Sequence, residues 1–358
     1  MTSSCIHVDT IVKPSMQKEE SSKAEQYKVE GEHGNRSYTL STVQITIKAS
    51  VEDFSQAPPL HIRPSFQLDE LRLSLQSIDS SADQTELITR QKALNIRSAK
   101  EYLKNMEDYG STLDFGNAAH VFNLSRKTTR VSFLNDKNKT LHDLLSANTI
   151  TAEGFNLIIA CCRPQPASGF HHAFWLMIIK HEIDLIVDLT FGDRALTRDM
   201  YYPTSRELVK KYCSFCVKKT TEYTEVAGGK LYHYQLKGHS SENKINCDVR
   251  RLHFFKWKRE ESCTLEELSE LVDTVYGWRT KKLVVHCDIG IDRTGCLLAG
   301  VILKHKFESK MLTWKNYIDE LDQVILSLRH DRNPYVLQDK QLYILIVRLI
   351  ELWLTKES

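Results

Sequence analysis

Strand-like patterns of apolar residues appear mainly in the second half of the chain. Residues 183–190 (IDLIVDLT) form an almost continuous apolar run, which is typical of a buried strand. Residues 231–236 and 251–257 alternate between apolar and polar side chains, as strands with one buried face do. A short apolar run over 283–286 predicts a further buried strand.

Segments with helical periodicity separate these strands. Residues 264–276 are amphipathic, and Thr264 with Glu267 three positions later has the spacing of a capping box. Other helices are predicted over 68–78, 99–106, 174–180, 294–306, 314–328 and 337–354. Interleaved strands and helices predict an α/β or α+β fold, with a mixed twisted sheet flanked by helices. The last helix is apolar enough to suggest a membrane or partner surface, but a packed final helix is the simpler interpretation.

The first part of the chain has a different composition. Residues 1–36 are rich in Ser, Lys, Glu and Gly and poor in apolar residues, which predicts disorder. An alternating segment over 38–51 indicates a strand, and the stretch from Pro58 to Pro64 indicates a linker. We therefore expect a largely disordered N-terminal extension over residues 1–60.

Charge and cysteine content narrow the function classes. The chain has 48 basic and 46 acidic residues, a net charge of +2, which gives no support for nucleic-acid binding. We find no run of about 18–20 apolar residues that would span a bilayer, and no secretory signal. A cytoplasmic protein is expected, with peripheral recruitment to a membrane as an alternative. The nine cysteines predict reduced thiols, and Cys213 and Cys216 are better read as ordinary cysteines than as a zinc site. No metal or cofactor is expected.

Residues 283–300 (LVVHCDIGIDRTGCLLAG) carry the chemistry. A strand leads to Cys287, and after five intervening residues Arg293 and Thr294 open a helix. A short loop between a strand and a helix N-terminus turns backbone N–H groups inward, which makes an anion site that also stabilises a thiolate. Arg293 can donate to two phosphate oxygens, Thr294 can hydrogen-bond the sulfur, and Gly290 permits an unusual backbone angle. The predicted phosphate-binding loop consists of Cys287, Asp288, Ile289, Gly290, Ile291, Asp292 and Arg293.

The run HCDIGIDRTG resembles the HCxxGxxRTG loop of the protein tyrosine phosphatase family. Residues 156–191 are similar to a long segment of that family, residues 201–203 (YYP) to its YWP, and residues 251–257 to the strand before its mobile acid loop. The similarity covers residues 95–355, which are expected to form one tyrosine-phosphatase-like domain. The resemblance implies a cysteine nucleophile, a phosphocysteine intermediate and a phosphorylated protein or peptide, above all one with phosphotyrosine, as partner.

The general acid of the family has no counterpart at its usual position. The family places an Asp two residues after a Trp, and the residue two after Trp257 is Arg259. An arginine does not give up its proton usefully, since its pKa is above about 12. Loss of a general acid typically slows a reaction by about 10²–10⁴-fold. Glu260 lies one position further on and would replace the acid only if the loop shifted.

Two other family segments also depart from the pattern. The family recognises phosphotyrosine with KNRY, whose Tyr stacks on the substrate ring, whereas residues 126–129 here read RKTT and contain no aromatic side chain. Residues 338–341 (QDKQ) resemble the family's QTxxQ but are one residue short. Gln338 and Gln341 are the candidates for positioning the hydrolytic water.

The loop itself carries two unusual carboxylates. Asp288 and Asp292 occupy positions that are small or glycine in most tyrosine-specific members, and their charge should weaken phosphate binding and oppose the thiolate. An Asp directly before the Arg also occurs in the related myotubularins, lipid phosphatases whose loop reads CxxGWDRT. Asp292 is therefore a candidate internal general acid, unless it caps the following helix or faces solvent.

Three functions remain open. The first is a regulatory protein with weak or no phosphatase activity that binds a phosphorylated or acidic protein segment in intracellular signalling. The second is an active cysteine phosphatase that acts on phosphotyrosine, another phosphoester or a phosphoinositide, with Asp292 or Glu260 as acid. The third is an interaction protein in which the loop is vestigial and partners bind the N-terminal extension or the last helix.

Overall fold

The computed structural model describes most of the second part of the chain. The described ranges are 81–104, 109–111, 124–131, 145–164, 168–191, 200–204, 207–212, 214–239, 244–257 and 262–357. Several predicted features lie outside these residues: the extension over 1–60, the strand over 38–51, the linker, the helix over 68–78, Cys213, Arg259 and Glu260.

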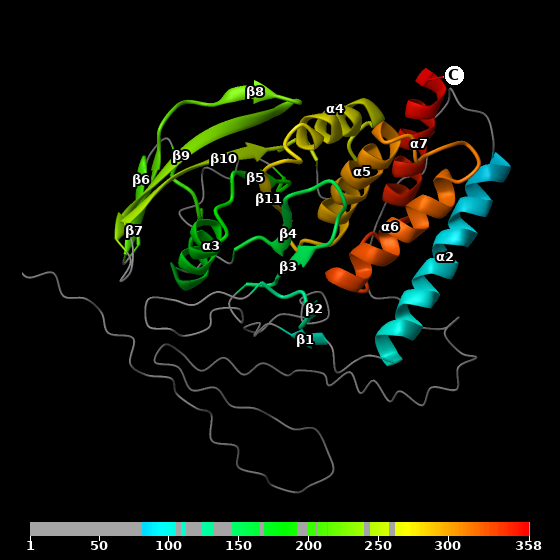
Figure 1. The fold of residues 1–358 in the computed structure, drawn as a ribbon, viewed down its shortest axis with the longest axis horizontal. Coiled ribbons are helices and arrows are strands. Elements are labelled where there is room, and N and C mark those ends of the chain that lie inside the picture. The colour runs from blue at the N-terminus through cyan, green and yellow to red at the C-terminus, as the bar shows by residue number, and fades with distance from the viewer. Residues whose placement is uncertain are drawn as a thin grey trace, which may run out of the picture. The chain divides into compact units, whose positions relative to one another are not determined.

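Nine of the described strands form one mixed sheet (Figure 1). They are β3 (Ala147–Ile150), β4 (Leu157–Cys162), β5 (Leu185–Asp188), β6 (Val209–Lys211), β7 (Phe215–Lys219), β8 (Thr224–Val226), β9 (Gly229–His239), β10 (Lys244–His253) and β11 (Lys282–Cys287). Their order is β3-β4-β11-β5-β10-β9-β7-β6, and β8 also pairs with β9. The central strands β4, β11, β5 and β10 are parallel, whereas the outer strands pair antiparallel. The predicted mixed sheet is confirmed.

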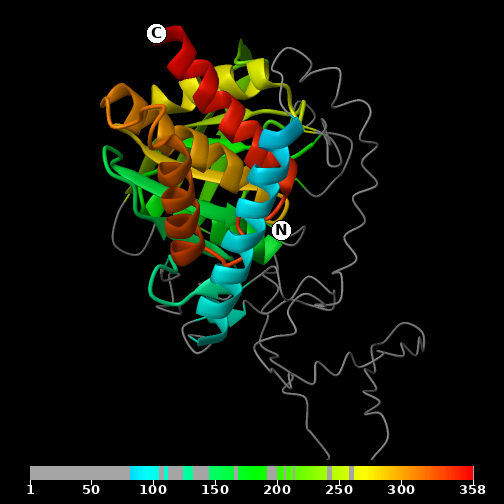
Figure 2. The ribbon, with the colours of Figure 1, turned by 90° about the vertical axis from the view of Figure 1, so that its right-hand side faces the viewer.

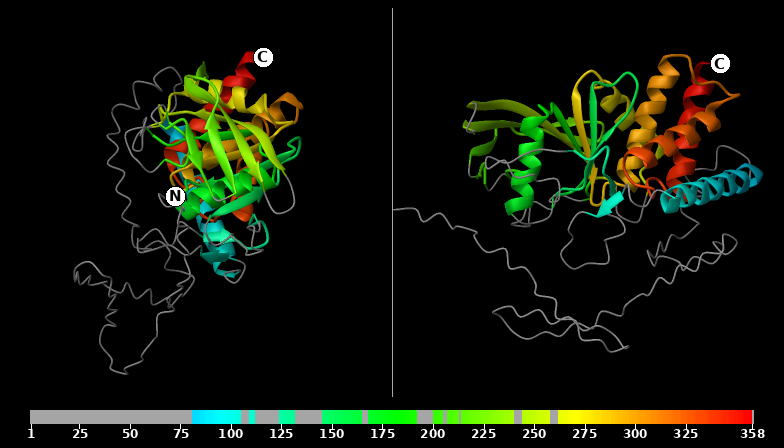
Figure 3. Two further views of the ribbon diagram at one scale, coloured as in Figure 1. Left: turned by 90° about the vertical axis from the view of Figure 1, so that its left-hand side faces the viewer. Right: turned by 60° about the horizontal axis from the view of Figure 1, so that its bottom comes forward.

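Helices flank the sheet on both faces (Figures 1 and 3). They are α2 (Ser81–Lys104), α3 (Ser168–Lys180), α4 (Leu265–Tyr276), α5 (Asp292–Glu308), α6 (Tyr317–Asp331) and α7 (Lys340–Glu357). Helix α3 covers one face, and α4 to α7 gather on the other. Helix α2 runs alongside α6 and α7, as Figure 2 shows from the side. A short separate ribbon is formed by β1 (Tyr109–Ser111) and β2 (Leu124–Arg126).

The sheet separates two apolar cores. On β11, Val284 belongs to the core under α3 with Phe174 and Trp175, whereas the next residue, Val285, belongs to the core under α4 and α5. Successive side chains of a strand point to opposite faces, so a strand covered on both sides needs apolar residues at every position. This explains the nearly uninterrupted apolar run over 183–190, whose centre forms β5.

The capping box of α4 is confirmed. Thr264 Oγ1 accepts a hydrogen bond from the Glu267 backbone N–H at 3.2 Å, and the Glu267 carboxylate accepts from the Thr264 N–H at 3.1 Å. The two bonds satisfy backbone donors that have no partner within the helix. Helix α4 therefore begins where the sequence predicts, and it leads the chain directly into β11.

The helix predicted over 99–106 is wrong in its bounds, because α2 begins at Ser81 and crosses the predicted start of the domain. Gln91 and Ser98 lie on its buried face together with Leu87 and Leu94. Polar residues at inward positions break the apolar period on which the prediction rests. They are tolerated there because both make hydrogen bonds, Gln91 to the Gln338 carbonyl and Ser98 to an arginine of α6.

The final helix is a packed element of the domain. Nearly all its apolar residues, such as Ile346 and Leu349, are buried in the core shared with α4 and α5. This confirms the simpler interpretation of the 337–354 segment. No helix among the described residues is both long and apolar enough to cross a bilayer.

Candidate phosphate-binding site

The loop between β11 and α5 directs one backbone N–H group at the sulfur of its cysteine. Cys287 ends the strand, and its sulfur accepts a hydrogen bond from the Gly290 backbone N–H at 3.1 Å. Gly290 has a φ of +78°, and a Cβ atom there would lie 2.1 Å from the carbonyl oxygen of Cys161. Only glycine fits a left-handed position so close to a neighbouring strand. The turn thus directs a backbone donor at the nucleophile.

Arg293 lies in the first turn of α5 and is anchored by the protein itself. Its Nη1 donates to the carbonyl oxygens of Leu189 at 2.6 Å and Trp257 at 3.3 Å. Its Nη2 donates to the Asp288 carboxylate at 2.7 Å. Both side chains of this ion pair are largely buried. The arginine that is predicted to bind phosphate is therefore already paired with a carboxylate of the same loop. Sequence reasoning missed this contact.

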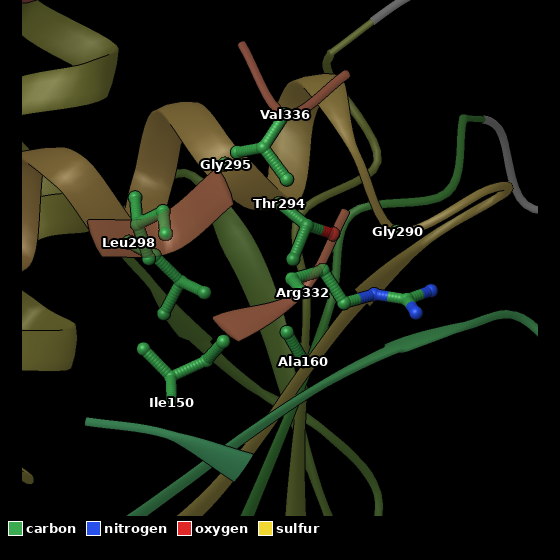
Figure 4. Close-up of a pocket in the computed structure, with 9 residues that line it drawn as sticks. Ile150, Ala160, Gly290, Thr294, Gly295, Leu298, Arg332 and Val336 are labelled. Atoms are coloured by element: carbon green, nitrogen blue, oxygen red, sulfur yellow. The ribbon is translucent and has the colours of Figure 1, made fainter. Parts of the chain in front are cut away.

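The hydroxyl of Thr294 does not make the predicted bond to the sulfur. Thr294 is 1% exposed, and its Oγ1 has no hydrogen-bond partner among the described residues. It lines a narrow cavity behind the loop together with Gly290, Gly295 and Arg332 (Figure 4). An unsatisfied buried hydroxyl costs about 1–3 kcal/mol of stability. Thr294 is near the loop but is not bonded to Cys287.

Arg332 supports the loop from behind and was not found by sequence reasoning. Its Nη1 donates to Ser146 Oγ and Asn148 Oδ1, both at 2.8 Å, and its Nη2 to the Ile289 carbonyl at 3.5 Å. The side chain is almost completely buried, and burial lowers the pKa of its guanidinium. Arg332 directly follows α6, 43 residues beyond Ile289 in the sequence, and no motif marks it.

A buried polar network lies behind Cys287. The Tyr201 hydroxyl is hydrogen-bonded to His286 Nε2 at 2.7 Å, and Arg251 donates through Nε and Nη2 to Asp188 at 2.9 and 2.6 Å. Burial lowers the pKa of His286, which favours the neutral imidazole. Burial alone would raise the pKa of Asp188, but the opposing charge of Arg251 holds that pKa well below its usual range. The residue before the nucleophile, His286, is thus held by the Tyr201 hydroxyl and packs edge-on against the ring of Phe174 on α3.

Asp292 is the first residue of α5, and its side chain is partly buried. The N-cap of α5 is Ile291 and no side chain caps it, so the interpretation of Asp292 as a helix cap is wrong. Burial, and after it the charge of Asp339, raises the pKa of Asp292 to about 6, although Arg293 opposes the shift. A carboxyl group with this pKa is partly protonated near neutral pH.

The glutamine segment is brought to the N-terminus of α5. A Cβ atom on Gly295 would lie 2.6 Å from Val336 Cγ1, so the chain before α7 packs directly on the start of α5. Asp339 accepts from the backbone N–H groups of Gln341 at 2.7 Å and of the next residue at 3.3 Å, and thereby caps α7. Gln338 and Gln341 are both partly buried. Their role in positioning water stays a prediction.

The RKTT segment, residues 126–129, is tied to the end of α6. Arg126 donates to the His330 carbonyl at 3.2 Å, and the Thr129 hydroxyl donates to the Asp331 carbonyl. Asn148 in turn donates to Thr129 Oγ1 at 2.9 Å. A threonine thus lies where the family's recognition segment ends in an aromatic residue. The described residues contain no cluster of His, Cys, Asp or Glu that could hold a metal ion.

Comparisons with known proteins agree with this geometry. The sequence model of the protein-tyrosine phosphatase family matches residues 124–351. Tyrosine-protein phosphatase 69D of Drosophila melanogaster is 24% identical over 202 residues, which cover 53% of this chain and 13% of that protein. The chain therefore spans only a small part of that relative.

Two solved structures have the same fold. PTPN18, solved in a study of its fingerprint on distinct HER2 tyrosine phosphorylation sites, has a TM-score of 0.58 at 17% identity, and the match covers 75% of this chain and 95% of that one. Trypanosoma cruzi protein tyrosine phosphatase TcPTP1 has a TM-score of 0.55 at 20% identity, with 78% and 94% covered. Because the family model matches more than half of the sequence, this chain belongs to the protein-tyrosine phosphatase family.

Proposed function

We propose that this chain is a tyrosine-phosphatase-like signalling protein that binds phosphorylated protein segments and hydrolyses them weakly or not at all. The binding element is the loop over residues 287–293. A phosphotyrosine segment is the proposed partner, because the chain belongs to the protein-tyrosine phosphatase family. We place the protein in the cytoplasm, and the domain at residues 95–355 extended to include α2.

The observation that carries this proposal is the intact nucleophile loop. Cys287 receives a backbone N–H from Gly290, and Arg293 stands beside it at a helix N-terminus. A thiol, an inward backbone amide and a guanidinium are together suited to bind a tetrahedral oxyanion. Covalent attack by the sulfur would form a phosphocysteine and release the alcohol, and water would then release phosphate.

Weak turnover is proposed because both steps of the chemistry lack a usual partner. The leaving oxygen needs a proton, and the residue two after Trp257 is Arg259. Thr294, which should assist the sulfur, has a buried hydroxyl with no hydrogen-bond partner among the described residues. Each defect slows the reaction without removing the anion site.

One observation favours the alternative, an active cysteine phosphatase. Asp292 adjoins Arg293 in the loop, and its pKa of about 6 leaves part of the population able to donate a proton at neutral pH. In this alternative Asp292 replaces the missing acid, and the substrate is a phosphotyrosine, another phosphoester or a phosphoinositide.

Turnover of an activated aryl phosphate separates the two functions, because its leaving group needs little help from an acid. The purified full chain is compared with Cys287→Ser and Asp292→Asn. Release of phosphate that requires Cys287 but not Asp292, limited to activated esters, is the expected result. Turnover of phosphotyrosine peptide or phosphoinositide that is lost in Asp292→Asn would establish the alternative. Absence of all release, with peptide binding unaffected by Arg293→Ala, would refute the loop as the site.

A further inference from the structure

The ion pair between Asp288 and Arg293 changes what the loop can bind. Arg293 uses Nη1 on two carbonyl oxygens and one N–H of Nη2 on Asp288. Among the described residues, its Nε–H and its second Nη2–H have no acceptor. A ligand oxyanion can still take these two donors, since a guanidinium offers five N–H groups in a fixed fork. Asp288 therefore does not block the site but remains beside any bound anion.

The distance between the two anions follows from the contact. Asp288 Oδ2 lies 2.7 Å from Arg293 Nη2. A ligand oxygen on the same nitrogen, at the usual charge-assisted distance of about 2.8 Å, lies within about 5.5 Å of that carboxylate oxygen. Both side chains are mostly buried, with 11% and 17% of their surfaces exposed, so water screens this repulsion poorly.

We propose that Asp288 is a specificity-determining residue that makes the loop favour singly charged phosphate or sulfate groups over dianionic phosphate monoesters. The charge of Arg293 is already offset by Asp288, so a bound monoanion adds one net negative charge to the loop and a dianion adds two. The Asp288 carboxylate repels each of these ligand charges, so its effect is larger for a dianion than for a monoanion. At about 5 Å and an effective dielectric constant near 20, each further ligand charge weakens binding by roughly 100-fold. The inference rests on the proposed function, because it assumes that the loop is the anion site.

Asp292 is the matched comparison within the same loop. It is also an aspartate next to Arg293 in the sequence, but it makes no hydrogen bond to the guanidinium. If Asp288 acts through its direct contact, removal of the Asp292 charge has a smaller effect. If only the total charge of the loop matters, both substitutions act alike.

Two peptides of one sequence measure the preference directly. One carries phosphotyrosine, which is mainly dianionic at pH 7.5 because its second pKa is near 6. The other carries sulfotyrosine, which has the same shape and a single charge. Dissociation constants are measured for the full chain in the Cys287→Ser background, alone and with Asp288→Asn, Asp288→Ser, Asp292→Asn or Arg293→Ala. Thermal unfolding checks that each variant is folded.

The expected result is that Asp288→Asn and Asp288→Ser tighten the binding of both peptides, and that they tighten phosphotyrosine binding by about 10- to 100-fold more than sulfotyrosine binding. Equal changes for the two peptides, no change, or the same effect in Asp292→Asn would overturn the inference. If Arg293→Ala weakens the binding of both peptides, but the ratio of their two dissociation constants does not change when Asp288 is substituted, only this inference fails. If Arg293→Ala weakens neither peptide, the proposed function fails with it.

Discussion

Replacing Asp292 with asparagine should make the protein more stable at neutral pH. Asp292 carries a carboxyl group whose ionised form is disfavoured in the folded chain by burial and by Asp339. Asparagine has nearly the same shape and no charge to desolvate. The substitution therefore removes a cost that the native loop carries whenever this carboxyl is ionised.

The pKa of about 6, against an ordinary value of 3.8, sets the size of the effect. Each pH unit between these two values is worth about 1.4 kcal/mol, so ionised Asp292 costs about 3 kcal/mol above pH 6. The helix dipole favours an anion in the first turn by about 0.3–1 kcal/mol, and asparagine loses this benefit. The net gain expected for Asp292→Asn is about 2 kcal/mol.

The direction of the pH dependence follows from proton binding. Between pH 4 and 6 the folded chain keeps a proton on Asp292 that the unfolded chain has lost. The contribution of Asp292 to stability therefore falls as pH rises through this window and is constant above it. At pH 4 the carboxyl is neutral in the folded chain and only about half ionised in the unfolded chain, so most of the difference in stability between Asp292→Asn and the native protein should be gone.

Urea unfolding at pH 4, 5.5 and 7.5 tests this reasoning. The free energy of unfolding of Asp292→Asn should exceed that of the native chain by about 2 kcal/mol at pH 7.5, and the difference should disappear towards pH 4. Asp248→Asn, at an exposed position of β10, is the control and should show no such difference. A gain that does not depend on pH, or no gain at pH 7.5, would refute the proposed origin of the shift.

Three further substitutions test the supports of the loop. Asp188→Ala leaves Arg251 buried without its carboxylate and should destabilise the fold by about 3–5 kcal/mol in urea unfolding. Gly290→Ala forces a Cβ against the Cys161 carbonyl, and calorimetry of phosphopeptide binding should show that affinity is lost. Thr294→Val removes an unpartnered buried hydroxyl and should leave the melting temperature unchanged or higher; a clear decrease would show that the hydroxyl is bonded.

Local patterns in the sequence predict the loop and the sheet well. The apolar runs place β5 and β11, the capping box places α4, and the spacing of Cys287 and Arg293 places a short loop between β11 and α5. Each of these signals is contained within a few neighbouring residues. The start of α2 was missed because Gln91 and Ser98 occupy buried positions that a hydrophobic period does not recognise.

Contacts between distant residues could not be predicted in the same way. Arg332 reaches the Ile289 carbonyl from the end of α6, and no local pattern marks it. Tyr201 belongs to the YYP segment that resembles the family's YWP, but that pattern does not show its bond to His286. The pair of Asp288 and Arg293 is different, since both residues were singled out as charged members of one loop. What the sequence lacked was the direction of the side chains, which decides whether Asp288 merely lowers the local potential or bonds the arginine.

The two carboxylates of the loop differ in their contacts and in their charge, and both differences bear on the proposed preference for a singly charged ligand. Asp288 contacts Arg293 and opposes the second charge of a bound phosphate. Asp292 makes no such contact, but its raised pKa allows it to carry a proton near pH 6. As the pH falls towards this value, a phosphate monoester loses its second charge while Asp292 gains its proton. The ligand form that Asp288 tolerates and the protonated form of Asp292, which is the acid of the proposed active phosphatase, are therefore populated under the same mildly acidic conditions. A loop of this composition is poorly suited to a dianion at neutral pH and better suited to a singly charged ester.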